Sequence, residues 1–310
     1  MMFLTSVWSR VKVFLPPGGK VSSRKQLLCG LVALGLLVGV TGPAMAQPSC
    51  RFTLLDVPGS SQASAIALGI NAAGQIVGSY YDVAYLHHGF LLDQGGYTTL
   101  DVPGANYTHA SGINASGHIV GYSFAGMESH GFLLDQGGCT TLAVPGAIWT
   151  YAQGINASGQ IVGTYYDAAD NSHGFLYDQG SYTTLDVPGG SGAIFALGIN
   201  ASGQIVGYYY HAGSTTHGFL LEQGSYTPLD VPGALHSYAH GINASGQIVG
   251  TYYDAAKGIH GFLLDQGNYT TLDVPGSTWT QAHAINDAGH IVGSYHDGAG
   301  QHGFLATPVP

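Results

Sequence analysis

Six histidines stand at the same place in six similar segments of this chain. They are His88, His130, His173, His217, His260 and His302, and each is followed directly by Gly-Phe. A side chain that recurs so regularly is typical of a structural hydrogen bond, here to a backbone carbonyl or a nearby Asp. We therefore expect these histidines to belong to the framework.

His240 and His283 are different, because they occupy matching positions in only two consecutive segments. Their imidazoles could approach each other, and imidazole nitrogen suits zinc or copper. A protein zinc site needs at least a third ligand, and the sequence indicates none. We predict no metal site and no cofactor, with His240 and His283 as the only metal candidates.

Motifs of catalysis do not occur in the sequence. It contains no G-x-S-x-G, no H-E-x-x-H and no phosphate-binding loop. Glu128 and Asp170 are acids that depart from the repeat pattern by position, and nothing pairs them as a general acid and base. We predict no catalytic residue and favour a protein that is not an enzyme.

Aromatic residues and histidines gather in the stretch that follows each V-P-G sequence. The candidates for ligand binding are Tyr107, His109, Trp149, Tyr151, His236, Tyr238 and Trp279. Flat apolar rings beside polar acceptors suit stacking on sugars or hot-spot contacts with a protein. The alternative is that these rings only pack the loops onto the framework.

These residues belong to a repeated unit. Six copies begin at Leu55, Leu100, Leu142, Leu185, Leu229 and Leu272, spaced 45, 42, 43, 44 and 43 residues apart. A copy reads roughly L-D-V-P-G, a variable stretch, G-I-N-A-S-G-Q-I-V-G, a second variable stretch, and H-G-F-L-L-D-Q-G-x-Y-T-T. The last copy lacks its Y-T-T segment, and a matching piece lies at residues 52–57. Periods of this size are typical of solenoids or propellers.

Each unit predicts four short strands, which in the fifth copy cover residues 237–243, 247–253, 260–264 and 269–274. Four antiparallel strands in about 43 residues is the size of one propeller blade. We predict an all-β, six-bladed β-propeller of four-stranded antiparallel blades, closed by pairing of the N- and C-terminal strands. The A-x-G-I-N strand should line the centre. An open β-solenoid is the alternative, but it leaves the divided repeat unexplained.

All variation in unit length falls in two connections, the stretch after V-P-G and the stretch before H-G-F. In a four-stranded meander these connections emerge on one face, which we call the variable face. Variable loops on a rigid scaffold commonly carry binding sites. Trp149 and Trp279 belong to units three and six, which lie opposite each other in a six-membered ring. This predicts two similar aromatic sites across the mouth of the channel.

Residues 1–46 are predicted to be a secretory signal peptide. Arg24 and Lys25 precede an apolar run, and small residues at Ala44 and Ala46 indicate cleavage after Ala46. The apolar run is about 14 residues long, shorter than a membrane span. The mature protein, residues 47–310, should therefore be one exported domain without a membrane span.

Removal of the leader leaves two basic residues, Arg51 and Lys257, against all 17 acidic ones, so that the net charge becomes −15. Such a surface repels phosphate backbones, and we exclude nucleic acid as a partner.

Cys50 and Cys139 remain after cleavage, but they belong to units too far apart for a disulfide. We expect a secreted monomer, extracellular or periplasmic.

The H-G-F-L and G-I-N-x-x-G-Q-I-V-G segments resemble the bacterial extracellular repeats called HAF, after a His-Ala-Phe signature. The resemblance covers Phe52 to Leu305. This chain departs from the signature by carrying a glycine, such as Gly89, where the family name has Ala. The resemblance implies an exported repeat protein of unassigned function and transfers no catalytic residue.

Three functions stay open from the sequence. The first is a secreted, non-catalytic binding module that recognises a glycan or a surface protein through the variable face. The second is a propeller enzyme that acts on polysaccharide as a hydrolase or a lyase. The third is a structural protein of the cell exterior. A fold alone does not choose among them.

Overall fold

The computed structural model describes residues 49–61, 64–187, 193–211 and 215–309. The chain divides into units 1–41 and 42–310, and every described residue lies in the second. The predicted signal peptide, residues 1–46, falls outside the described residues. All regular elements in the described ranges are strands, which confirms the all-β prediction. None of the described residues forms a helix long and apolar enough to span a membrane.

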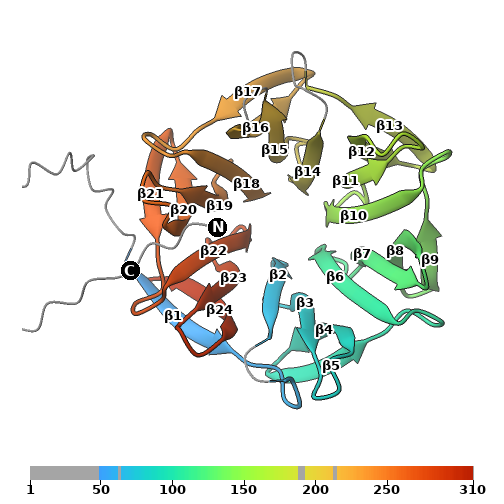
Figure 1. Ribbon diagram of the computed structural model, residues 1–310, viewed down its shortest axis with the longest axis horizontal. Coiled ribbons are helices and arrows are strands. Elements are labelled where there is room, and N and C mark those ends of the chain that lie inside the picture. The colour runs from blue at the N-terminus through green and yellow to red at the C-terminus, as the bar shows by residue number, and fades with distance from the viewer. Residues whose placement is uncertain (1–48, 62–63, 188–192, 212–214, 310) are drawn as a thin grey trace, which may run out of the picture. The chain divides into compact units, whose positions relative to one another are not determined.

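Each repeat contributes an antiparallel meander, and Figure 1 shows these meanders around a common centre. The innermost strands are β2 (Ile66–Ile70), β6 (Tyr107–Ile113), β10 (Trp149–Ile155), β14 (Ile194–Ile199), β18 (His236–Ile242) and β22 (Trp279–Ile285). The second strands are β3 (Ile76–Tyr81), β7 (Ile119–Ala125), β11 (Ile161–Tyr166), β15 (Ile205–His211), β19 (Ile248–Tyr253) and β23 (Ile291–His296). The third strands are β4 (His87–Asp93), β8 (Glu128–Asp135), β12 (Ser172–Asp178), β16 (Thr215–Glu222), β20 (Ile259–Asp265) and β24 (Gln301–Pro308). The outermost strands are β5 (Gly96–Leu100), β9 (Gly138–Leu142), β13 (Ser181–Leu185), β17 (Ser225–Leu229), β21 (Asn268–Leu272) and β1 (Cys50–Leu55).

The head and the tail of the described chain share one sheet, in the order β1-β24-β23-β22. β1 pairs antiparallel with β24 over six residue pairs, from Cys50 opposite Pro308 to Leu55 opposite Gly303. His302 Nδ1 also lies 3.1 Å from a carboxylate oxygen of Asp56, which follows β1. The segment at residues 52–57 thus lies where the last repeat lacks its own fourth strand.

Valine and isoleucine of the I-V-G sequence face two different cores. In β19, Ile248 packs inside unit five, whereas Val249 packs into the core of unit six. The same relation joins Val292 of unit six to the core of unit one. Consecutive apolar residues are therefore needed because each second strand is covered on both sides, as the sequence predicted.

The glycine of the same I-V-G sequence allows the strands to approach each other. A Cβ added to Gly163 would stand 2.0 Å from the carbonyl oxygen of Tyr151 and 2.8 Å from the ring of Phe175. Phe175 has no exposed surface and fills the middle of its unit. Any side chain at position 163 would displace both the inner strand and this ring.

Buried asparagines link each unit to the next through the hairpin between the inner and second strands. The Nδ2 groups of Asn71, Asn114, Asn156, Asn200, Asn243 and Asn286 each donate to the backbone carbonyl of the next residue in this series, at 3.0–3.1 Å. The last bond returns from Asn286 to Asn71, so the series is a cycle. All six asparagines are buried, and a turn sequence such as N-A-S-G does not by itself show these bonds between units.

Each asparagine also holds its own turn. Asn156 Oδ1 accepts from the backbone N–H groups of Ser158 and Gln160 at 3.1 and 3.0 Å. Gly159 has a φ of 84°, a value that favours glycine, and it closes the hairpin. One side chain therefore fixes the turn and its distance to the neighbouring unit.

Cys50 and Cys139 are free thiols, as expected. Cys139 is exposed on the outermost strand of unit two. It occupies the position at which Tyr182 of unit three packs edge-on against Phe175.

We predict that Asn156→Ala lowers the free energy of unfolding by about 2–3 kcal/mol, because it leaves buried donors and acceptors without partners. Asn268→Ala is the matched control, since Asn268 is an exposed turn residue whose side chain bonds only locally. The control should change stability by less than about 0.5 kcal/mol. Equal denaturant midpoints for the two variants would contradict a structural role for the cycle.

Candidate functional site

One group of stacked rings spans the variable-face ends of units one to three. Tyr107 lies against His87 with ring centres 3.7 Å apart and nearly parallel. Tyr122 stacks on His109 at 4.6 Å and meets Tyr151 edge-on at 4.8 Å. The contacts pass from unit to unit, so the rings form a continuous arc.

A second group covers units four and five. Phe195 stacks on Tyr208 at 4.6 Å, and Tyr208 meets Tyr238 edge-on at 4.9 Å. His236 lies 5.7 Å from Tyr253, with the rings perpendicular. Both groups combine residues from the first half of an inner strand with residues of the second strand paired with it.

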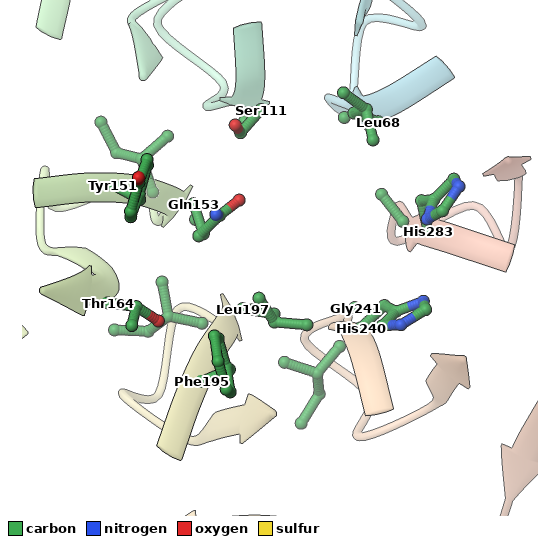
Figure 2. A pocket seen from close by; sticks show the side chains of 18 of the residues that line it. Leu68, Ser111, Tyr151, Gln153, Thr164, Phe195, Leu197, His240, Gly241 and His283 are labelled. Carbon is green, nitrogen blue, oxygen red and sulfur yellow. The ribbon is translucent and has the colours of Figure 1, made fainter. Parts of the chain in front are cut away.

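The two groups flank a cavity of about 540 Å³ at the centre of the ring of inner strands. Six side chains surround it at one repeat position, and Figure 2 shows them facing the same space: Leu68, Ser111, Gln153, Leu197, His240 and His283. Tyr151 and Phe195 lie on the wall nearer the variable face, on either side of Thr164 in Figure 2. The inner strands line the centre, as the sequence predicted.

The side chains that line this cavity carry no charge. None of its lining residues in the described chain is Asp, Glu, Lys, Arg or Cys. Burial raises the pKa of Tyr122 and Tyr208, so both phenols keep their protons. Burial lowers the pKa of His240 to about 4, and burial beside His240 lowers the pKa of His283 well below its ordinary value. The cavity is therefore neutral from weakly acidic to alkaline pH.

His240 and His283 lie side by side, with stacked rings 5.4 Å apart. His240 Nδ1 lies 2.8 Å from the carbonyl oxygen of Ala282, and since a carbonyl only accepts, Nδ1 carries the proton. His283 Nε2 lies 3.1 Å from the Ser294 hydroxyl. The described residues contain no group of three or more His, Cys, Asp or Glu side chains that could share a metal ion.

The predicted binding residues fall into three places. Tyr107, His109, Trp149 and Tyr151 join the first aromatic group, and His236 and Tyr238 join the second. Trp279 lies apart, against His296 at 5.9 Å. The contacts among them link neighbouring units, and two similar sites across the mouth of the channel stay a prediction. Their role in binding stays a prediction.

Three important residues were not among the predicted ones: Tyr122, Phe195 and Tyr208. Tyr122 and Tyr208 directly follow I-V-G, where the other four units have Ser or Thr. This departure from the repeat was visible in the sequence. The position of Tyr122 and Tyr208 in the site could not be read from the sequence. Only the pairing of β6 with β7 and of β14 with β15 places these rings beside the inner-strand positions.

The repeated histidines serve the framework, as expected. His88 Nδ1 lies 2.8 Å from Asp101 and its Nε2 lies 3.5 Å from Asp82. Unit two departs from this arrangement because Ala143 replaces the first aspartate, and His130 there lies 3.7 Å from Glu128. The His–Asp pair ties the third strand to the segment that follows the outermost strand.

No family model and no curated relative matches the chain. Solved structures are similar to it at low sequence identity. Virginiamycin B lyase from Staphylococcus aureus is 10% identical, with 84% of this chain and 100% of that chain covered and a TM-score of 0.51. TolB from Acinetobacter baumannii is 14% identical, with 76% and 64% covered and a TM-score of 0.54. The SapL1 lectin, solved with alpha methyl fucoside, is 14% identical, with 77% and 90% covered and a TM-score of 0.50. The likeness establishes the fold as that of β-propeller proteins.

We predict that stability falls as the pH drops from about 6.5 toward 4. The pKa of His240 is lowered in the folded state, so the unfolded chain takes up its proton first and gains from acidification. Between pH 6.5 and pH 4, the free energy of unfolding of His240→Gln should decrease by up to about 3 kcal/mol less than that of the wild type. Gln153 occupies the same repeat position, so the fold accommodates the change.

The control for this measurement is His118→Gln, at a turn position where four other units have Gln. Urea unfolding at several pH values should give the control the same pH dependence as the wild type. An unchanged slope in His240→Gln would contradict the burial of a neutral imidazole.

Proposed function

We propose that this protein is a closed, six-bladed β-propeller of the HAF-repeat type that is exported and binds a neutral glycan without catalysis. The observation that carries the proposal is the uncharged, aromatic-walled cavity at the centre of the inner strands. The acidic mature chain and the predicted signal peptide support a location outside the cytoplasm.

Four kinds of contact between the last repeat and the N-terminal part of the described chain support closure. β1 pairs with β24, His302 meets Asp56, Val292 packs into the core of unit one, and Asn286 donates to Asn71. Each has its counterpart between other neighbouring units or within them. An open solenoid would leave the two ends with unpaired edges.

The chemistry of the cavity supports a sugar. Tyr151, Tyr166 and Phe195 offer flat apolar faces, and Gln153 and Ser111 offer neutral donors and acceptors. A neutral, hydroxyl-rich ring matches these groups, whereas a charged ligand would find no counter-charge. The SapL1 lectin shows that a related framework accommodates a sugar ligand.

A polysaccharide-cleaving enzyme would usually need paired carboxylates near the scissile bond. The lining residues of this cavity in the described chain include no Asp or Glu. The same cavity therefore favours binding over hydrolysis.

Closure is tested with a disulfide. Arg51 and Thr307 are cross-strand partners in β1 and β24, where Cα atoms stand about 4.5–5.5 Å apart, within disulfide range. We expect Arg51→Cys/Thr307→Cys, made in a Cys50→Ser/Cys139→Ser background, to oxidise within one chain and to raise stability by about 2–4 kcal/mol. Non-reducing electrophoresis and thermal unfolding measure both effects. Cross-linking only between molecules would count against closure.

Glycan binding is tested on an array of neutral saccharides. Tyr151→Gln should weaken any binding by about 10–100-fold, because it removes a stacking face. Gln281 holds the same repeat position in unit six, which keeps the variant compatible with the fold. Tyr226→Phe on the outermost strand β17 is the control, since Phe52 occupies that position in β1. The absence of binding to every neutral saccharide would overturn the proposal.

A further inference from the structure

One loop on the variable face exposes large apolar side chains. Between β3 and β4, Val83, Tyr85 and Leu86 are 76%, 79% and 53% exposed, and neighbouring Tyr81 is 40% exposed. The corresponding loops of units three and five read Ala-Ala-Asp-Asn and Ala-Ala-Lys-Gly after their aspartates. Unit one has therefore replaced small and polar residues with apolar ones at solvent-exposed positions.

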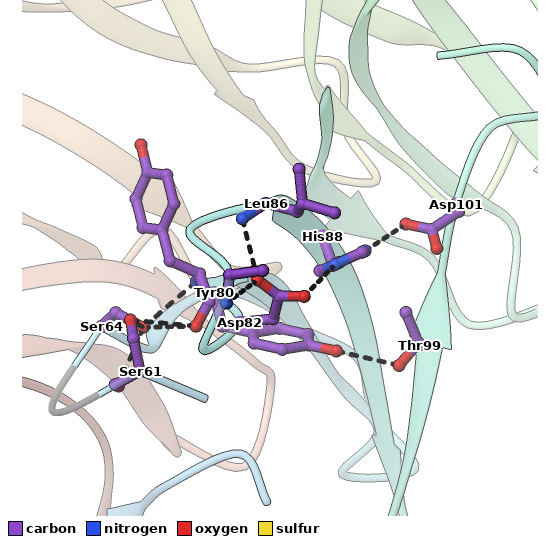
Figure 3. Close-up of polar contacts among 10 residues, drawn as sticks. Ser61, Ser64, Tyr80, Asp82, Leu86, His88, Thr99 and Asp101 are labelled. Atoms are coloured by element: carbon purple, nitrogen blue, oxygen red, sulfur yellow. Dashed lines mark hydrogen bonds and ion pairs between the residues drawn. The ribbon is translucent and has the colours of Figure 1, made fainter. Parts of the chain in front are cut away.

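The loop is held in a single conformation. Asp82 accepts from the backbone N–H groups of Ala84 and Leu86 at 2.8 Å each, and Asp82 also meets His88, as Figure 3 shows. Tyr85 has a φ of 62°, a conformation that a bulky residue seldom adopts. Asp170 and Lys257 hold the matching position with φ of 65° and 67°. The backbone of this turn is thus common to the units, and the exposed ring is specific to unit one.

The loop is continuous with the aromatic wall of the cavity. Tyr81 lies edge-on against His87, with ring centres 4.6 Å apart, and His87 stacks on Tyr107 at 3.7 Å. Tyr107 in turn lies 6.1 Å from Tyr122, which lines the cavity. We call Tyr81, Tyr85, Leu86, Tyr107 and Tyr122 the aromatic strip.

We propose that the aromatic strip is an extended subsite, so that the ligand is a neutral oligosaccharide chain with one end in the cavity and the following rings on the strip. This inference rests on the proposed glycan-binding function and adds the length of the ligand to it. A single sugar ring in the cavity would leave Tyr85 and Leu86 uncovered.

Two physical arguments favour a neutral sugar chain on the strip. Exposed rings gain free energy when an apolar face covers them, and a loop backbone held by hydrogen bonds to Asp82 loses little conformational entropy on binding. No Lys or Arg belongs to the strip or to the cavity lining in the described chain, and the carboxylates of Asp82 and Asp101 beside His88 would repel an anionic polymer.

The experiment exchanges the loop for that of unit three, as Val83→Ala/Tyr85→Asp/Leu86→Asn. The probe is a panel of neutral glycans, each immobilised as a ladder from mono- to hexasaccharide. For the wild type, we expect the longest members to bind at least about tenfold tighter than the monosaccharide. The exchange should abolish this gain and leave monosaccharide binding unchanged, which also reports that the variant is folded.

Val309→Asn is the matched control, because it removes an apolar side chain that is 50% exposed outside the strip. It should keep the full dependence on chain length. Wild-type binding that is equal for all lengths, or a gain that survives the loop exchange, would overturn the extended subsite while leaving glycan binding intact. No binding of any saccharide by the wild type would overturn the proposed function itself, and the extended subsite with it.

Discussion

The cycle of buried asparagine amides is the constraint on which the rest of the structure depends. Each side chain accepts from one or two backbone N–H groups of its own hairpin and reaches the carbonyl of the neighbouring hairpin. A unit cannot shift along the axis or tilt without breaking a bond on each side, and each broken bond leaves a buried polar group unsatisfied. The inner strands are therefore held at a fixed height along the central axis. This fixes the relative positions of the side chains around the cavity.

Much of the fold was predictable because the repeat is regular. The alternation of Gly-rich turns and β-branched runs gave the strands, and the divided last repeat predicted the pairing of residues 52–57 with the H-G-F segment. The asparagine bonds between units were not predictable. In a sequence, Asn in N-A-S-G is fully explained by its turn, and the identity of its second partner depends on how neighbouring units stack.

The site was predictable only in part, for a related reason. The repeat showed which inner-strand positions vary, and Tyr107, Tyr151 and Tyr238 do line the variable side. It did not show which rings touch. Tyr122 and Tyr208 come from second strands, and strand register places them against the inner strands of their own and neighbouring units. The ring contacts of the site therefore join neighbouring units. The framework is repeated six times, whereas the residue at the cavity-lining position varies among the units.

The pairing of β1 with β24 also shapes how the molecule reaches its native state. Within a unit, strands that pair are separated by short loops, and such local contacts form quickly. The contact between Asp56 and His302 instead joins residues 246 positions apart. Bringing the two ends of the described chain together closes a much longer loop than pairing two strands that follow each other in the chain, and loop-closure entropy rises with the length of the loop. The pairing of β1 with β24 therefore carries a larger entropy cost than the local strand pairs.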